Sequence, residues 1–257
     1  MRALLPFLLA GLCLAAPATA MVHPNCGDSL PPVHAFRLDG PVRVDGVLDE
    51  AVWQRPPSAR EFMQGDPVEG AVPSESTWVW VAWDERALYF AARCWDSHPD
   101  SIITNLVRRD VLAPGDRLLL LLDPSHDHRN GYFFSLSAAG VLRDGLLSND
   151  TWNDDSWDGV WEGRARCESG PSGGWTVEMR IPLSQLRYPT GPGRTWGINV
   201  RRRIERRAEE DYLVFQPKSA TGYVSRFAHL TGIEIPHPAR SLRSEEHTSE
   251  LQSLTDI

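Results

Sequence analysis

Short apolar runs recur along most of the chain and are separated by clusters of Gly, Pro, Asn and Asp. In residues 77–83 apolar side chains occupy both alternating sets of positions, and a second run at 87–95 follows a short polar turn. Alternating positions of this kind, closed by turn residues, are typical of neighbouring strands. We therefore expect an antiparallel pair of strands here, joined by residues 84–86.

Further runs of similar length are bounded by turn-forming residues, as expected of short strands. They lie at 117–123, 132–138, 141–147, 161–168, 175–181, 195–204, 212–216 and 227–235. The five consecutive leucines at 118–122 suit a strand that is covered on both faces. Helical signals are confined to 49–53 and 182–186. The pattern predicts an all-β fold, a two-sheet antiparallel β-sandwich of about ten short strands with one or two short helical turns.

Both ends of the chain differ from this pattern. Met1-Arg2, an apolar run at 4–16 and the sequence Ala18-Thr19-Ala20 form the three parts of a secretory signal peptide, expected at 1–20. The apolar run is shorter than the roughly 20 residues that a membrane-spanning helix needs. From residue 243 the sequence resembles the translation of a sequencing-library adapter, so we expect 243–257 not to be native.

These boundaries leave a leader at 21–35 and one domain at 36–242. The signal peptide predicts export to the periplasm, the outer membrane or the extracellular space. If the adapter interpretation holds, the chain is a fragment whose natural continuation is missing.

The composition and charge of the chain disfavour two classes of function, nucleic-acid binding and catalysis. The net charge of −8, without a Lys/Arg-dominated patch long enough to follow a phosphate backbone, disfavours a nucleic-acid partner, because such binding depends on neutralising phosphates. The chain contains no His-Glu-x-x-His motif, and its acidic residues are too numerous for any one pair to indicate a glycosidase. We therefore expect a binding protein and not an enzyme.

One segment combines aromatic and polar side chains in the way that a sugar site requires. Sugar rings pack their C–H faces on aromatic planes while their hydroxyls bind carboxylates and amides. Segment 149–161 supplies this mixture, and the candidate ligand-binding residues are Trp152, Trp157, Asn149, Asp150, Asp154 and Asp155. The alternative is that Trp157 and Trp161 pack in the core. We expect the remaining tryptophans of the strand runs to be core, although Trp80 or Trp95 could line a sheet face.

Closely spaced oxygen donors raise the question of a metal. Asp123, Asp127 and Asn130 are compatible with a structural Ca²⁺ ion, as is the second cluster at 150–155, and a solvated acidic loop is the alternative. His126 and His128 could be read as a zinc pair, but no third ligand is visible in the sequence, so we expect surface histidines.

The cysteines remaining after the signal peptide are Cys26, Cys94 and Cys167, which allow at most one disulfide. Cys94 and Cys167 both lie in expected strands. A bond between them and two free buried thiols remain equal alternatives.

Several motifs together indicate a family. Residues 44–53 (VDGVLDEAVW), then Phe62, the 67–73 segment and 83–90 (WDERALYF) resemble the opening of a family 9-like carbohydrate-binding domain. Motifs at 116–117, 122–123, 129–132 (RNGY), 144–145, 156–162 (SWDGVWE), 174–182 and 196–199 (WGIN) resemble the subgroup found at the N-terminus of bacterial outer-membrane proteins. The resemblance covers roughly residues 36–240. It implies a two-sheet sandwich, carbohydrate binding without catalysis, structural calcium, a sugar held between two tryptophans and, in full-length relatives, a following β-barrel.

The sequence therefore predicts a non-catalytic carbohydrate-binding module that serves polysaccharide binding and catabolism at the bacterial surface, with membrane contact only through the missing barrel. One alternative is a periplasmic docking or plug domain that does not bind sugar. A lesser alternative is a b-type haem domain, for which the chain offers Met21, Met63, Met179 and Lys218 as ligands.

Overall fold

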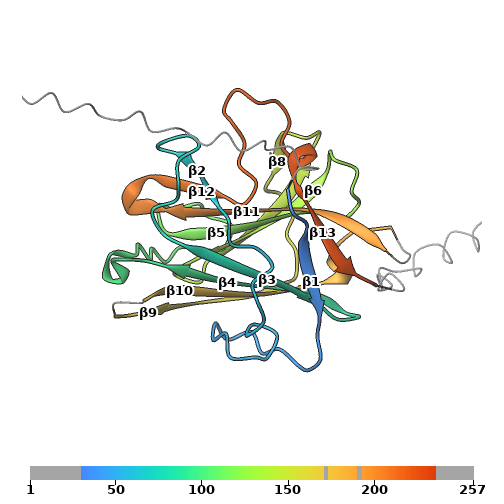
Figure 1. Ribbon diagram of the computed structural model, residues 1–257, viewed down its shortest axis with the longest axis horizontal. Coiled ribbons are helices and arrows are strands. Elements are labelled where there is room, and N and C mark those ends of the chain that lie inside the picture. The colour runs from blue at the N-terminus through green and yellow to red at the C-terminus, as the bar shows by residue number, and fades with distance from the viewer. Residues whose placement is uncertain (1–29, 171–172, 190–192, 236–257) are drawn as a thin grey trace, which may run out of the picture.

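The computed structural model describes residues 30–170, 173–189 and 193–235 (Figure 1). The expected signal peptide, the first part of the leader with Met21 and Cys26, and the 243–257 segment lie outside the described residues.

The described chain is built of strands connected by loops and single 3-10 turns. The strands are β1 (Val33–Arg37), β2 (Met63–Asp66), β3 (Thr77–Trp83), β4 (Ala87–Trp95), β5 (Arg117–Asp123), β6 (Gly131–Ser137), β7 (Leu142–Ser148), β8 (Trp152–Asp154), β9 (Glu162–Glu168), β10 (Gly174–Pro182), β11 (Arg194–Ile204), β12 (Glu209–Tyr212) and β13 (Ala228–Ile233). The 3-10 turns are η2 (Pro99–Ser101), η3 (Leu183–Gln185), η4 (Glu205–Arg207) and η5 (Val224–Arg226). In the part of the chain that the structure describes, no helix is long and apolar enough to cross a membrane.

The strands form two layers that share β1. Layer A has the order β8-β7-β6-β5-β11-β13, with β12 and β2 added beside β11, and layer B has the order β3-β4-β10-β9. β1 pairs in parallel with β13 of layer A and with β3 of layer B, whereas the other strand pairs are antiparallel. In Figure 1 β5 and β11 accordingly lie over β4, β10 and β9, with β1 and β13 at one side.

This arrangement confirms the predicted all-β sandwich and adds one feature to it. The two layers are a single mixed sheet folded over at β1, because β1 bonds to both. Val33 and Ala35, which the sequence assigned to the leader, are buried in this shared strand. The domain therefore begins at the start of β1 and not at residue 36.

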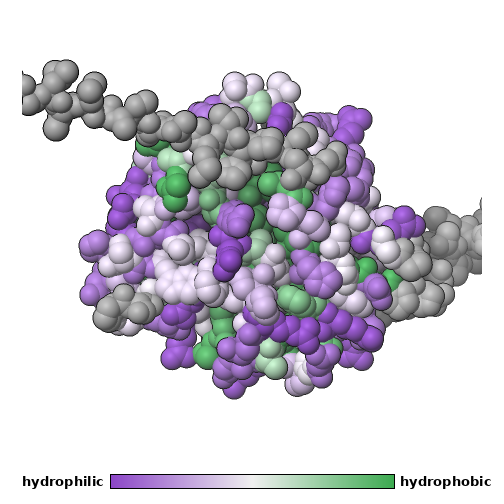
Figure 2. Space-filling model, in the orientation of Figure 1, coloured by the Kyte–Doolittle hydropathy of each residue, from purple (hydrophilic) through white to green (hydrophobic). Residues whose placement is uncertain are grey.

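The core follows from the alternation of side chains along the strands. Leu118, Leu120 and Leu122 of β5 face the central core between the layers, while Leu119 and Leu121 face a second cluster on the outer side of layer A. A third cluster, on the outer side of layer B, includes Trp53, Trp80 and Tyr89. β5 is thus covered on both faces, as its run of leucines predicts. The face of the molecule in Figure 2 is mostly hydrophilic, with apolar residues in separate patches.

The observed strand boundaries agree with some of the predicted apolar runs and differ from others. β3, β4 and β5 coincide with the predicted runs, but the strand expected at 212–216 is β12, four residues that begin at Glu209. Its sequence, Glu-Glu-Asp-Tyr, reads as a loop, and it forms a strand because it pairs with the arginine-rich end of β11. The short strands β2 and β8 were also missed. Residues 51–54 are turns and not a helix, whereas the turn expected at 182–186 is η3.

Candidate functional site

The acidic residues of the segment predicted to bind a ligand mostly form hydrogen bonds and ion pairs within the fold. The carboxylate of Asp150 accepts hydrogen bonds from the backbone N–H groups of Tyr223 (2.8 Å) and Ser225 (2.8 Å) and from the Ser225 hydroxyl (2.8 Å). These donors hold the pKa of Asp150 below its usual value despite partial burial. Asp150 therefore fastens the loop that precedes β13.

The neighbours of Asp150 also contact their own chain. Asp154 accepts the Ser156 N–H (2.9 Å), Asp155 forms an ion pair with Arg143 (2.6 Å), and Asn149 is exposed in a left-handed turn conformation. The side chain of Trp152 lies outside the described part of the structure. Among the described side chains of the segment, those of Asp150, Asp154 and Asp155 thus bind groups of this chain.

The two tryptophans that follow pack inward. Trp157 is half-buried and lies edge-on to the rings of Tyr132 and Phe134, with centroids 5.2 and 6.0 Å apart. Trp161 is buried in the core, and its indole N–H donates to Asp144 (3.0 Å). The core alternative for these two residues thus agrees with the geometry.

The oxygen donors proposed for calcium close a turn after β5. The buried Asp123 carboxylate accepts the N–H groups of His128 (2.9 Å) and Asp127 (3.3 Å), and burial raises the pKa of Asp123. Asp127 accepts both the backbone N–H (2.8 Å) and the side-chain amide (2.9 Å) of Asn130. The chain's own donors thus occupy these oxygens, and a calcium ion at Asp123, Asp127 and Asn130 stays a prediction.

An exposed pair of tryptophans lies instead at the end of layer B where β3 begins and β4 ends. Trp78 and Trp95 are both half-exposed, and their rings meet edge-to-face with centroids 4.7 Å apart. Together with residues 74–76 they line an open hollow of about 360 Å³. Both project from the outer face because Val79 of β3 and Cys94 of β4 take the inward positions. The strand ends thus present two aromatic side chains to solvent.

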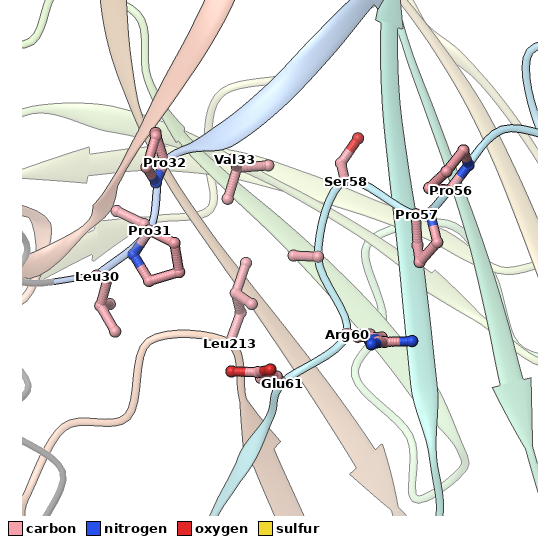
Figure 3. A pocket seen from close by; sticks show the side chains of 12 residues that line it. Leu30, Pro31, Pro32, Val33, Pro56, Pro57, Ser58, Arg60, Glu61 and Leu213 are labelled. Atoms are coloured by element: carbon pink, nitrogen blue, oxygen red, sulfur yellow. The ribbon is translucent and has the colours of Figure 1, made fainter.

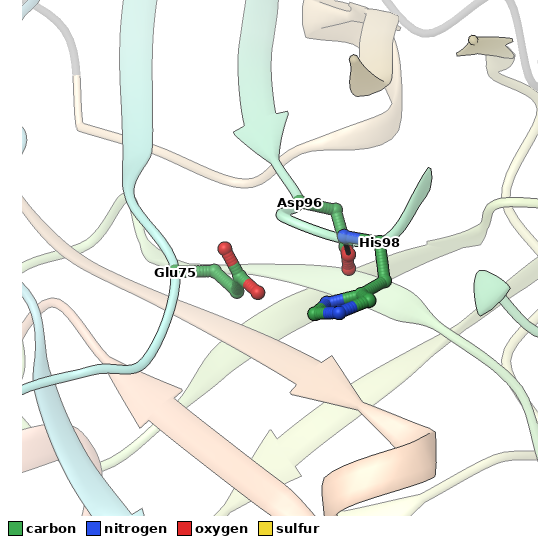
Figure 4. A group of neighbouring side chains, drawn as sticks. All are labelled: Glu75, Asp96 and His98. Carbon is green, nitrogen blue, oxygen red and sulfur yellow. Dashed lines mark hydrogen bonds between the residues drawn. The ribbon is translucent and has the colours of Figure 1, made fainter. Parts of the chain in front are cut away.

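The buried carboxylate of Glu75 lines this hollow, and the buried carboxylate of Asp96 lies within 4.8 Å of the Glu75 carboxylate. Glu75 accepts the Ser97 hydroxyl (2.6 Å) and an N–H of Arg206 (2.9 Å), and Asp96 accepts a second N–H of Arg206 (2.6 Å). Ligand atoms of Glu75, Asp96 and His98 all lie within 4.8 Å of one another (Figure 4). Two guanidinium groups, those of Arg206 and Arg207, already approach these carboxylates, so the group is better suited to hydrogen-bonding a neutral ligand than to holding a divalent cation.

A buried arginine fixes the hollow from behind. Arg202 of β11 reaches across the interior and donates to the carbonyl of Ser76 (2.9 Å), the hydroxyl of Thr77 (3.0 Å) and the carbonyl of Trp95 (2.6 Å). In front, Arg93 lies over the Trp95 ring at 5.7 Å and forms an ion pair with Glu168 (2.6 Å). The aromatic pair therefore stands on strand ends that both layers hold in place.

A second cavity, of about 370 Å³, lies between the start of β1 and the 56–61 segment. Figure 3 shows Leu30 and Pro31 on one side, Pro57 and Ser58 on the other, and Leu213 between them. Its lining is mainly aliphatic, with Arg60 and Glu61 at its border, and none of its lining residues is aromatic. A polyol would find little to stack on or to bond there, so the Trp78–Trp95 hollow is the better candidate.

The sequence predicted only some of the residues of this site. The possibility that Trp95 lines a sheet face is realised, whereas Trp78 was assigned to the core and Glu75 was not singled out. Trp80, the other named possibility, is on the outer side but is covered. The signal was present in the hairpin register: the short turn at 84–86 aligns Trp78 with Arg93, two positions before Trp95.

The structure also decides the question of the cysteines. Cys94 is buried, Cys167 is exposed, and both are free. Trp175 of β10 pairs with both residues and therefore lies between them. Two strand spacings, about 9–10 Å, exceed the Cα separation of about 4.4–6.8 Å that a disulfide needs. A bond between these two cysteines is thus excluded, and only Cys94 is the buried thiol that was expected.

Three of the residues weighed for haem ligation lie in the described part of the chain. Met179 is buried in the core, Met63 begins β2, and Lys218 forms an ion pair with Asp66 at the surface.

Comparison with known proteins gives a family and a fold. The sequence model of the family described as carbohydrate family 9 binding domain-like matches residues 44–205. A search of curated proteins finds none that matches the chain.

Three solved structures are similar to the chain. One is a candidate carbohydrate-binding protein of Bacteroides uniformis (TM-score 0.56, 13% identity, 77% of this chain and 97% of that one covered). Two are of a carbohydrate binding module family 9 from Caldicellulosiruptor kristjanssonii. The first is in complex with cellotriose (TM-score 0.51, 17% identity, 77% and 92% covered), and the second is in complex with glucose (TM-score 0.50, 16% identity, 83% and 98% covered). At these identities the likeness is one of fold.

Proposed function

The chain belongs to the carbohydrate family 9 binding domain-like family, and we propose that it is a non-catalytic carbohydrate-binding module whose ligand stacks on Trp78 and Trp95. The observation that carries this proposal is the exposed aromatic pair beside two buried carboxylates. Aromatic planes pack against the C–H faces of a pyranose ring, and carboxylate and guanidinium groups bind its hydroxyls.

The surroundings of the pair favour a neutral sugar. The negative charges of Glu75 and Asp96 are balanced by Arg206 and Arg207 together, and that of Glu168 by Arg93. An uncharged polyol can exchange hydrogen bonds with these groups without adding a net charge to a half-buried site. Because one structural neighbour is in complex with cellotriose and another with glucose, gluco-configured oligosaccharides are the first ligands to test.

The wider context follows from the sequence. The segment at 1–20 supports export, and we propose that the module acts at the bacterial surface in polysaccharide binding and catabolism, joined to an outer-membrane barrel. Calcium, if it binds, would serve a structural role in the turn after β5. The alternative site is the segment with Trp152 and Asn149, whose local mixture of aromatic and polar residues supports it.

The test is a ligand titration of the mature chain, residues 21–257, with and without calcium. Isothermal calorimetry and tryptophan fluorescence would follow glucose, cellobiose, cellotriose and a panel of other oligosaccharides. We expect saturable binding that weakens at least tenfold in Trp78→Ala and in Trp95→Ala, and that is unchanged in Trp152→Ala.

The matched tryptophan variants separate the outcomes. Binding that is lost only in Trp152→Ala would move the site to segment 149–157 and refute the Trp78–Trp95 proposal. No response to any sugar, from protein whose near-ultraviolet circular dichroism shows native packing, would refute carbohydrate binding and favour a docking domain.

A further inference from the structure

Three histidines from two distant segments meet on the outer side of layer A, in the opposite layer from the tryptophan pair. His126 and His128 lie in the turn after β5, and His229 lies in β13. The ring centroids of His126 and His128 are 4.3 Å apart, and those of His126 and His229 are 5.1 Å apart. All three side chains are half-buried, and the Nε2 atom of His126 is inaccessible to solvent.

The sheet register explains why they meet. Gly197 of β11 pairs with Asp123 of β5 on one side and with His229 of β13 on the other. A Cβ atom at Gly197 would lie 3.0 Å from the Cβ of Asp123. The absence of a side chain there lets the turn after β5 approach β13 across β11.

The turn itself orients two of the imidazoles. His126 and His128 both adopt left-handed backbone conformations, with φ of 51° and 60°. This conformation is uncommon for residues that carry a side chain. It is held by Asp123, whose carbonyl accepts the His126 N–H and whose carboxylate accepts the His128 N–H. The chain thus fixes an unfavourable backbone shape that places the two rings beside His229.

Imidazole nitrogen is a preferred ligand of Zn²⁺ and of the neighbouring divalent transition metals. With Zn–N distances of about 2.0–2.1 Å and tetrahedral angles, the centroids of two bound imidazoles are about 5 Å apart. The separations of 4.3 and 5.1 Å are close to this value. The imidazole rings must still rotate to bring their nitrogens together. Among the described residues, the group whose ligand atoms already lie within 4.8 Å of one another is Glu75, Asp96 and His98.

We propose that His126, His128 and His229 bind one borderline divalent transition-metal ion, with Zn²⁺ as the representative, and that water completes the coordination. The ion links the turn after β5 to β13, which are joined through β11 alone in the sheet order. It acts as a clamp on layer A, and it binds independently of the sugar site. Because the ion binds the native state, it raises the melting temperature by mass action.

The experiment is a Zn²⁺ titration of the mature chain after removal of metals with EDTA and dialysis. Calorimetry gives stoichiometry and affinity, and the visible absorption of added Co²⁺ reports a tetrahedral site. We expect one Zn²⁺ per chain from this cluster and at least tenfold weaker binding in both His229→Gln and His128→Gln. His34→Gln, which removes an exposed imidazole at β1, is the matched control and should bind as the unaltered chain does.

Three outcomes would overturn the proposal. They are no Zn²⁺ binding by folded protein, undiminished binding in both cluster variants, and loss of binding in Asp96→Asn but not in His229→Gln, which would place the ion at Glu75, Asp96 and His98. Because His128 lies in a surface turn, His128→Gln keeps the test valid if His229→Gln fails to fold. Sugar affinity measured on the same variants should not change.

Discussion

The stability of this domain should depend on pH, and the buried carboxyl group of Asp211 should make a large contribution to that dependence. Asp211 lies in β12 opposite Arg202 and is fully buried between the layers. Burial raises the pKa of Asp211 from 3.8 to about 8, the nearby charge of Glu209 adds to the increase, and Arg202 opposes it. The group is therefore protonated in the folded protein at neutral pH, whereas the unfolded chain ionises it near pH 4.

The sign and size of the effect follow from these two values. The native state binds this proton more tightly, so the stabilisation is complete below pH 3.8 and is lost as the pH rises through 8. Between pH 6 and pH 9 the loss in the free energy of unfolding is about 2–3 kcal/mol, at 1.36 kcal/mol for each pKa unit. Asp211→Asn replaces the protonated acid with a neutral group of the same shape. The variant should therefore be about as stable as the unaltered chain below pH 4, already more stable at pH 6, and more stable by a further amount of about 2–3 kcal/mol at pH 9.

The assay is urea unfolding followed by tryptophan fluorescence at pH 6, 7, 8 and 9 for both proteins. Glu178, whose pKa burial raises to about 7, titrates in the same range, but it is present in both proteins, so the difference between the two curves isolates Asp211. If the two stabilities run parallel from pH 6 to pH 9, Asp211 is ionised throughout and the reasoning is wrong.

Three further predictions concern buried polar groups. Arg202→Met removes the three hydrogen bonds that a fully buried guanidinium donates. The free energy of unfolding, measured in urea, should fall by about 3–5 kcal/mol. A decrease of less than about 1 kcal/mol would contradict the role of Arg202 in holding the strand ends. Asp144→Ala leaves the indole N–H of Trp161 and the backbone N–H of Gly159 without their acceptor and removes an ion pair with Arg109. It should lower stability by about 3 kcal/mol, as the thermal midpoint will show; an unchanged midpoint would speak against it. In native protein a thiol reagent should label Cys167 and spare Cys94, whose pKa burial raises to about 11, so Cys167→Ser should lose that label, and labelling of Cys94 before unfolding would refute this.

Local sequence patterns predict a strand correctly where the strand's own residues determine how it is buried. The leucines at 118–122 have no stable arrangement other than coverage on both faces, and the structure covers both. β12 is the opposite case, because Glu209, Glu210 and Asp211 become a strand only when the arginines of β11 lie beside them. That pairing depends on the fold as a whole. β1 was missed for the same reason, since its partners come from near both ends of the domain.

The candidate site, too, could be predicted from the sequence only in part. Sequence composition directs attention to segment 149–161 because acidic and aromatic residues are concentrated there. Nothing local reveals that the donors for Asp150 come from Tyr223 and Ser225, on a loop far along the chain. Trp78 and Trp95 look like ordinary strand residues, and both are only half-buried, whereas Trp80 on the same face is covered.

The aromatic pair, and not the carboxylates beside it, is therefore the right place to test the function. Glu75 and Asp96 share Arg206, and Glu75 also accepts two hydrogen bonds from Ser97. Glu75→Gln would weaken these ion pairs and the strand ends they fix, so a loss of sugar binding could follow from either cause. Trp95 presents its ring to solvent, and Trp95→Ala removes the stacking surface while the carbonyl that Arg202 binds remains. A tenfold weaker affinity with unchanged urea unfolding in that variant would thus report contact with the sugar itself.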